Sequence, residues 1–254
     1  MEHINMEIVF FLLAAGFIAA FIDSVVGGGG LISMPALLMT GLAPGVVLGT
    51  NKLASICCSL TSSISFFRSG KMDIGLVKYL FPLSLIGSIL GAYTVRLIPS
   101  EILKPLVLVM LILVAIYTIL KKDWGDKSTY QGISKKAGVW GGLAAFALGF
   151  YDGFFGPGAG SFLIFVFLML GFDFVVAAGN AKALNLASNL GAVATFLSAG
   201  SVNYIYGFSM GLAMIIGAVA GSKFAMAKGS AYVKPLFISV TTLLIGKQLW
   251  DILH

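Results

Sequence analysis

Charged residues that interrupt long apolar stretches are the first candidates for chemistry in this sequence. Five of them lie within such stretches or at their edges: Asp23, Lys52, Asp152, Asp173 and Lys182. If these stretches cross a membrane, each ionised group at the bilayer centre costs at least about 2.5–3.5 kcal/mol. Such groups face protein or a water-filled cavity and mark sites for ions, protons or charged solutes. The simpler alternative is that each lysine reaches to the membrane surface and each aspartate caps a helix fragment.

Four of the five charges belong to a long internal repeat. The segment around Asp23 matches that around Asp152 at an offset of 129 residues, and the segment around Lys52 matches that around Lys182 at an offset of 130. The second register also pairs further residues: Gly70 with Gly200, Gly87 with Gly217, Gly91 with Gly221 and Lys104 with Lys234. A duplication of the whole fold explains this agreement. The chain accordingly divides into a first repeat (residues 1–120), a cytoplasmic linker (121–136) and a second repeat (137–254).

The composition predicts that both repeats lie in a membrane. Hydrophobic residues make up 59% of the chain and charged residues 10%, and the mean hydropathy is +1.01. Soluble domains carry roughly 25% charged residues, because their surface faces water. Among the stretches without a charge are residues 8–22, 53–67, 79–95, 105–120, 137–151, 153–172 and 183–222. A membrane helix needs about 20 apolar residues, so we expect an all-α polytopic membrane protein with about 8–10 membrane helical segments.

Each repeat is expected to contain five helical pieces. In the first repeat they are residues 6–23, 30–41, 45–67, 73–96 and 101–120. In the second they are residues 137–152, 159–171, 174–198, 203–224 and 231–250. The second piece of each repeat is short, since about ten helical residues span only about 15 Å, half a bilayer. The first two pieces of each repeat therefore form either two crossings or a re-entrant hairpin.

The loop charges predict opposite orientations for the two repeats. Residues 68–78 and the linker are basic, whereas residues 200–207, which correspond to the first of these loops, carry no charge. Short basic loops stay in the cytoplasm, so equivalent loops lie on opposite sides of the membrane. We therefore expect two inverted-topology repeats in a multi-pass protein of the cell (cytoplasmic) membrane, with both termini outside. The net charge of +6 is attributed to the cytoplasmic loops and not to nucleic-acid binding.

Glycine runs follow both aspartates: residues 27–30 are all glycine, and residues 156–158 read Gly-Pro-Gly. Neither segment easily holds a regular helix, and breaks at corresponding positions of two repeats indicate a transporter binding site. Each resuming helix presents N–H groups and a positive dipole end, which attract an anion. The candidate binding residues here are Gly28, Gly29, Gly30, Leu31, Gly158, Ala159, Gly160 and Ser161. The alternative role for these glycines is close helix packing.

A polar stripe lies beside each glycine break. In the first repeat it comprises Asn51, Lys52, Ser55 and Ser59, and in the second Lys182, Asn185 and Asn189. The helical spacing places the amides and hydroxyls of each stripe on one face. We predict that the substrate contacts Asn51, Lys52, Ser55, Lys182, Asn185 and Asn189. Asp23 and Asp152 are candidates for organising the breaks or carrying a proton, and hydrogen bonding between helices alone is the alternative for the stripes.

Sites of other kinds have little support in the sequence. His3 and His254 lie at the two ends of the chain and Cys57 adjoins Cys58, so we expect no catalytic residue, metal or cofactor. The nucleotide-binding motif Gly-x-x-x-x-Gly-Lys-Ser/Thr does not occur. An intramembrane aspartyl protease is a distinct hypothesis, because Asp152 follows a tyrosine. Its partner motif Gly-x-Gly-Asp is absent and duplication explains both aspartates, so we expect no enzyme.

The glycine-rich segments and their neighbours resemble the TauE/SafE family of sulfite and organosulfonate exporters, also called TSUP permeases. The resemblance rests on residues 23–32 (DSVVGGGGLI), 49–52 (GTNK), 153–160 (GFFGPGAG) and 181–182 (AK). It extends over about residues 8–250, nearly the whole chain. The resemblance implies a membrane transporter for a small anion, mainly a sulfur-containing one such as sulfite or sulfoacetate.

We therefore hypothesise a secondary transporter in which a small anion lies between the two repeats and reaches either side by alternating access. Backbone N–H groups at the breaks, with the nearby lysines and amides, would hold the anion. Coupling would be to an ion gradient or to the gradient of the substrate itself. A passive anion channel is the alternative function, and assembly as a homodimer is left open.

Overall fold

The computed structural model describes residues 6–99, 101–102, 130, 132 and 135–228, and every regular element in these ranges is an α-helix. The helices are α1 (Met6–Val26), α2 (Gly30–Leu38), α3 (Pro44–Arg68), α4 (Ile74–Arg96), α6 (Lys135–Phe154), α7 (Ala159–Met169), α8 (Phe174–Ser198) and α9 (Tyr204–Lys228). The predicted all-α fold is confirmed, and each of these helices corresponds to one predicted piece. The two remaining predicted pieces, residues 101–120 and 231–250, and most of the predicted linker (121–136) lie almost wholly outside the described residues.

Asp23 lies within the last turn of α1 and Asp152 within the last turn of α6, so neither is at the end of its helix. α1 continues three residues beyond its predicted end, because the N–H of Gly27 donates to the carbonyl oxygen of Asp23 at 2.9 Å. Gly27 has a φ of +82°, which terminates the helix. Gly156 has a φ of +103° and lies two residues beyond the end of α6 at Phe154. The predicted ends were too early, since a left-handed glycine and not the acidic residue stops each helix.

The two short helices lie directly after the chain breaks. α2 has 9 residues and α7 has 11, so each spans about half of the hydrocarbon core at 1.5 Å per residue. Both end before their predicted ends, because turns with the positive-φ glycines Gly41 and Gly171 follow them. The next helices begin with Pro44 in α3 and with Asp173 as the N-cap of α8, where its carboxylate accepts two backbone N–H groups. Of the two roles considered for the aspartates, Asp173 therefore has that of a helix cap.

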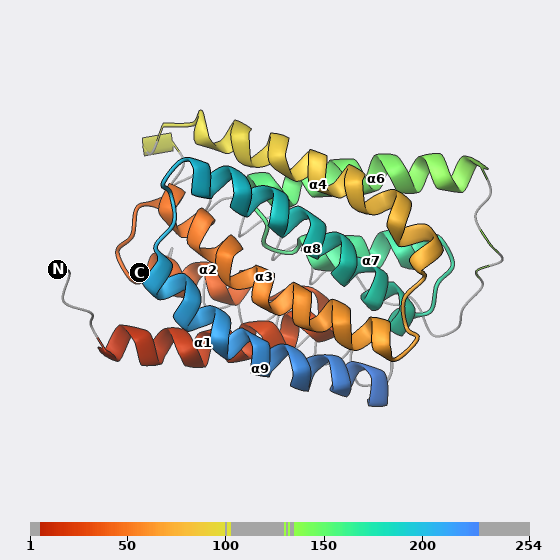
Figure 1. Cartoon of the computed structure of the whole chain (residues 1–254), viewed down its shortest axis with the longest axis horizontal. Coiled ribbons are helices and arrows are strands. Elements are labelled where there is room, and N and C mark those ends of the chain that lie inside the picture. Colours follow the sequence, from red (N-terminus) through yellow and green to blue (C-terminus); the bar gives the residue numbers. More distant parts are fainter. Residues whose placement is uncertain (1–5, 100, 103–129, 131, 133–134, 229–254) are drawn as a thin grey trace, which may run out of the picture.

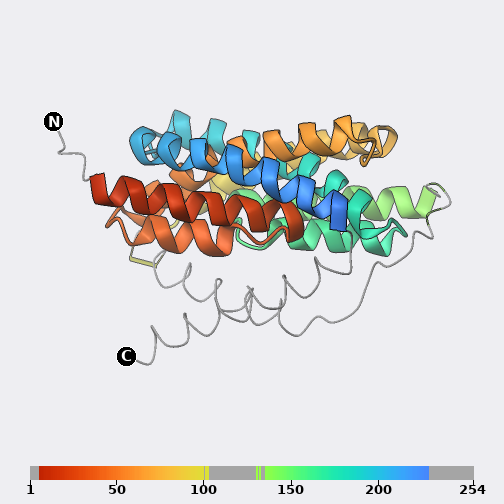
Figure 2. The ribbon, with the colours of Figure 1, turned by 90° about the horizontal axis from the view of Figure 1, so that it is seen from below.

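Helices α3 and α8 run side by side through the middle of the bundle (Figure 1). On one side α1 packs against α9, which also contacts α3, and on the other side α6 packs against α4, which also contacts α8. All these long helices lie roughly along the long axis of the molecule, as the view in Figure 2 also shows. The first helix of each half is thus paired with the fourth described helix of the other half.

Glycines at equivalent positions of the two halves allow this pairing. A Cβ atom at Gly91 in α4 would lie 2.0 Å from the carbonyl oxygen of Phe150 in α6. A Cβ atom at Gly221 in α9 would lie 2.3 Å from the carbonyl oxygen of Phe21 in α1. Both distances are far below van der Waals contact, so the helices can approach this closely only where a side chain is missing. Close packing is therefore the role of these two glycines, which lie outside the chain breaks.

The outside of the bundle is apolar, whereas its interior contains charged and polar side chains. Large apolar residues such as Phe10, Ile86 and Leu212 are exposed on α1, α4 and α9, while Lys182 and Asp152 are buried. These three helices are long and apolar enough to cross a membrane. Apolar side chains that face outward and ionic groups that face inward are typical of helices surrounded by lipid.

Candidate functional site

Two buried ion pairs connect the two halves of the chain. Lys52 Nζ in α3 lies 2.5 Å from Asp152 Oδ1 in α6, and Lys182 Nζ in α8 lies 2.6 Å from Asp23 Oδ2 in α1. The pairs are crossed, because each lysine binds the aspartate of the other half. The sequence repeat related these four residues but did not indicate which lysine binds which aspartate. The alternative in which the lysines reach the membrane surface is wrong, since Lys52 is 2% exposed and Lys182 is 0% exposed.

The first pair, Lys52–Asp152, is enclosed by further hydrogen bonds. Asp152 Oδ2 accepts from Asn185 Nδ2 at 2.8 Å and also from the hydroxyl of Ser188, and its side chain is 2% exposed. Lys52 Nζ also donates to Asn189 Oδ1 at 3.3 Å. Each of the two carboxylate oxygens therefore has at least one donor, which is the arrangement that a buried ion pair requires.

The second pair, Lys182–Asp23, is more open at its carboxylate. Asp23 Oδ1 accepts from the backbone N–H of Gly29 at 3.2 Å, so this residue also organises the chain break. Asp23 Oδ2 accepts from the thiol of Cys58 at 3.5 Å, a weak donor. The side chain of Asp23 is 17% exposed, whereas that of its partner Lys182 is 0% exposed. One side of this carboxylate is therefore accessible.

The two chain breaks contact each other and share hydrogen bonds. The backbone N–H of Ser161 donates to the carbonyl oxygen of Gly27 at 3.2 Å, and the Ser161 hydroxyl donates to that of Val26 at 2.8 Å. Ser161 was predicted to offer its N–H to an anion, but the first break already accepts that hydrogen bond. The amides of Gly30 and Gly160 have no hydrogen-bond partner among the described residues, because each lies in the first turn of a helix.

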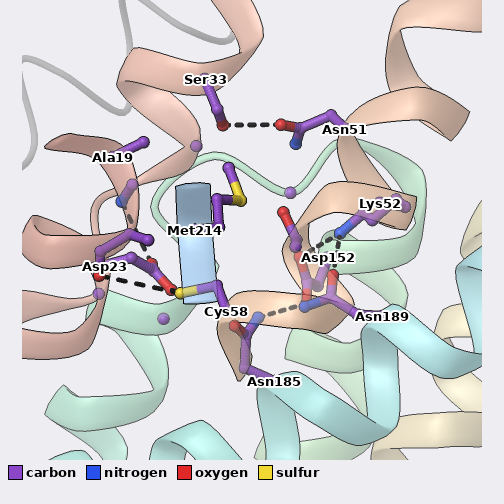
Figure 3. Close-up of a pocket in the computed structure, with 17 residues that line it drawn as sticks. Ala19, Asp23, Ser33, Asn51, Lys52, Cys58, Asp152, Asn185, Asn189 and Met214 are labelled. Carbon is purple, nitrogen blue, oxygen red and sulfur yellow. Dashed lines mark hydrogen bonds and ion pairs between the residues drawn. The ribbon is translucent and has the colours of Figure 1, made fainter. Parts of the chain in front are cut away.

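A small cavity that is partly open to solvent lies between the halves. Of the predicted residues, it is lined by Asp23, Gly29, Gly30, Asn51, Lys52, Ser55, Asp152, Gly160, Asn185 and Asn189. The predicted residues outside this lining are Gly28, Leu31, Gly158, Ala159, Ser161 and Lys182. Leu31 packs in the apolar core, and Lys182 lies behind Asp23. Figure 3 shows Asp23 on one side of the cavity, with Lys52 and Asp152 on the other.

Several residues that the sequence reasoning did not select also line the cavity, among them Ser33, Cys58 and Met214. Cys58 follows Asn51 and Ser55 at helical spacing, so the periodicity of the polar stripe was a signal that could have found it. The Ser33 hydroxyl donates to Asn51 Oδ1 at 2.6 Å, which leaves the amide nitrogen as the donor that Asn51 can offer. Met214 belongs to α9 and only tertiary packing brings it here, so no sequence pattern indicated it.

The charges around the cavity cancel when both aspartates are ionised. Asp23, Lys52 and Asp152 are the charged residues in the described lining, and Lys182 completes the second pair. Both lysines are bound to a carboxylate, so neither presents an uncompensated positive charge to an entering solute. The neutral donors that face the cavity are amides, hydroxyls and the backbone N–H groups of the breaks.

These features define a class of protein. An all-helical, membrane-embedded bundle with a polar, charged cavity where two broken helices meet is typical of membrane transporters. The family comparison agrees, since a model described as sulfite exporter TauE/SafE matches residues 12–247. The chain belongs to the TauE/SafE family and is a membrane transporter of that type, which confirms the resemblance seen in its sequence.

Curated relatives are similar over nearly their whole length. A probable membrane transporter protein, ORF9, of Sinorhizobium sp is 38% identical and aligns with 100% of this chain and 97% of its own. A probable membrane transporter protein of Haemophilus influenzae is 35% identical, with 98% and 97% covered. The probable membrane transporter protein YfcA of Escherichia coli is 33% identical, with 94% and 89% covered. None of these three names specifies a solute. No solved structure matches the chain.

Proposed function

We propose that this protein is a secondary transporter for a small sulfur-containing anion, such as sulfite or an organosulfonate. The anion binds in the cavity between the two halves, and alternating access exposes it to either side of the cell membrane. The observation that carries this proposal is the cavity itself, because both halves contribute its lining and both chain breaks border it. The name of the matching family supports the sulfur-containing class.

The donors in the lining suit an oxyanion. Asn51 offers an amide nitrogen, and Gly30 and Gly160 offer backbone N–H groups at the positive ends of α2 and α7. A sulfite or sulfonate group has three oxygens that can accept such hydrogen bonds. Lys52 lines the cavity and Lys182 lies behind Asp23, and the positive charge of each is balanced by its carboxylate partner. When the halves move, each lysine must either stay bound to its aspartate or exchange it for another partner.

The repeats are proposed to have inverted topology, with both termini outside the cell. The basic loops predict this orientation, and the matched contacts of Gly91 and Gly221 support an exchange-symmetric arrangement of the halves. Labelling of single cysteines from either side of the membrane tests it. A cysteine introduced at Gly70 is expected to react from the cytoplasm, and one introduced at Gly200 from outside. Reaction of both from the same side would contradict the inverted topology.

Transport is tested with purified protein in liposomes and a panel of sulfite, sulfoacetate and other sulfonates. Asn51→Asp places a carboxylate in the cavity and is expected to reduce flux at least tenfold. Asn203→Asp is the matched control, because Asn203 caps α9 through its side-chain oxygen and aspartate caps equally well. No flux above empty liposomes for any anion of the panel would refute the substrate class. Saturable counterflow supports a carrier, whereas unitary currents would establish the channel alternative.

The proposal assigns no catalytic role to the two aspartates. Each aspartate binds a lysine of the other half, so the pair is not arranged as two carboxylates that share one proton. Proteolysis of a membrane peptide that Asp152→Asn abolishes would contradict the proposal.

A further inference from the structure

The proposed anion transport poses a problem of charge, because the two ion pairs leave the cavity neutral. An anion that enters lies near the exposed side of the Asp23 carboxylate, and like charges repel strongly where water is scarce. We infer that Asp23 takes up one proton for each anion bound, whereas Asp152 stays ionised and holds the two halves together. This inference rests on the proposed function and adds its coupling ion.

The two carboxylates differ in the ways that this division requires. Asp152 is 2% exposed and accepts from an ammonium, an amide and a hydroxyl, so a proton on it would break a filled set of hydrogen bonds. Both carboxylates line the cavity, but Asp23 is 17% exposed, and its donors besides Lys182 are one backbone N–H and one thiol. Asp23 is therefore the carboxylate that water in the cavity can reach.

Because Lys182 lies behind Asp23, protonation of Asp23 changes the electrostatic potential that an anion meets in the cavity. Lys182 Nζ lies 2.6 Å from Asp23 and is itself fully buried, so its charge is neutralised by that carboxylate. When Asp23 becomes a neutral acid, the ammonium behind it has no counter-charge. The surroundings have a low dielectric constant, so its field then extends into the cavity and favours an anion there.

The other titratable groups around Asp23 do not supply the uncompensated positive charge that would favour an anion. α3 contributes Lys52 and Cys58, and α6 contributes Asp152, which is bound to Lys52. The Tyr151 hydroxyl of α6 donates to the carbonyl oxygen of Pro157, and in α9 the described lining residue is Met214, which does not titrate.

The proton and the anion balance in each cycle. A proton from the aqueous side bonds to a carboxylate oxygen of Asp23, and a monovalent anion enters opposite Lys182. After the halves move, the anion leaves to the other side, the acid returns its proton to that side, and the Asp23–Lys182 ion pair forms again. One monovalent anion and one proton thus move in the same direction with no net charge.

The deciding experiment uses the unmodified protein in liposomes that contain a pH-sensitive dye. Isethionate is a suitable probe, because its sulfonate group keeps one negative charge throughout the pH range and cannot itself deliver a proton. An isethionate gradient is expected to carry protons with it, and a gradient of one pH unit to support about tenfold accumulation, independent of membrane potential. Isethionate flux without proton movement would overturn the inference while leaving the proposed transport intact. Failure of all anion flux would instead refute the proposed function.

Two matched variants locate the proton. Asp23→Asn imitates the neutral acid, so it is expected to bind isethionate at an affinity that no longer depends on pH and to lose proton movement and accumulation. Asp173→Asn changes the same kind of side chain at the N-cap of α8 and is expected to keep the pH dependence. Accumulation driven by a pH gradient in Asp23→Asn would overturn the assignment. If Asp23→Asn does not fold, the dye measurement on the unmodified protein still decides whether a proton moves with the anion.

Discussion

The two crossed ion pairs have the same charges but different neighbours. Asp152 accepts from Ser188 and Asn185, whereas at the equivalent positions Asp23 has the thiol of Cys58 and the shorter side chain of Ser55, which lines the cavity. A hydroxyl and an amide are stronger donors than a thiol. These two differences between equivalent positions leave one pair closed and the other accessible.

This difference separates two tasks that a symmetric site would have to combine. The closed pair joins α3 to α6 and satisfies its charges completely within the protein. The open pair joins α1 to α8, and although both aspartates line the cavity, its carboxylate is the more exposed one, at 17% against 2%. The pairings of α1 with α9 and of α6 with α4 are nevertheless equivalent in the two halves.

Replacement of each aspartate by alanine tests the comparison of the two pairs, and it is the test with the largest expected effect on the free energy of unfolding. Asp152→Ala leaves Lys52 as a buried, uncompensated charge, and we expect a loss of about 3–5 kcal/mol in the free energy of unfolding. Asp23→Ala also leaves a buried lysine, Lys182, but is expected to cost less, about 1.5–3 kcal/mol, because Asp23 is partly exposed, whereas loss of Asp152 also removes the acceptor of Asn185 and Ser188. Denaturant unfolding of the purified protein in detergent measures both. Equal costs would contradict the division into a closed and an open pair.

A double variant removes the charges of the closed pair together. Lys52→Met with Asp152→Leu replaces the ion pair by apolar groups, which is often neutral or stabilising for a buried pair. We expect it to recover most of the stability lost in Asp152→Ala without recovering transport. Recovery of transport would show that this pair serves stability alone.

Closely packed glycines test the similarity of the halves. Gly91→Ala and Gly221→Ala force a methyl group against a backbone carbonyl, and each is expected to cost about 1–3 kcal/mol of unfolding free energy. Gly45→Ala is the control, because Gly45 lies in the first turns of α3 with nothing within 4 Å of an added Cβ. It is expected to be neutral or slightly stabilising. A large cost for one packed glycine and none for the other would show that the halves pack differently.

Exchange of Cys58 and Ser188 is the mildest test of the comparison. Cys58→Ser gives Asp23 a stronger donor and is expected to raise the unfolding free energy by up to about 1 kcal/mol, whereas Ser188→Cys lowers it by a similar amount. Thermal unfolding of the two single variants measures these changes. Changes of the same sign would indicate that the donors do not decide which pair is closed.

The sequence was sufficient to predict the helices and to select the charged residues of the site, but not to predict which lysine binds which aspartate. Hydropathy and the repeat located every described helix, because apolar length and glycine breaks are local properties. The crossing of Lys52 to Asp152 depends on how α3 meets α6, and the contribution of Met214 depends on the packing of α9. The N–H of Ser161 was misassigned for the same reason, since its acceptor belongs to the other break.

The central claim is that the anion binds in the cavity between the two ion pairs. A structure determined with selenite or a bromine-labelled sulfonate, at a concentration that saturates flux, tests this claim by locating the heavy atom through its anomalous signal. The account predicts one peak within hydrogen-bonding distance of Asn51 and the N–H groups of Gly30 and Gly160. A peak elsewhere, for example beside Arg96 at the end of α4, with an empty cavity would contradict it.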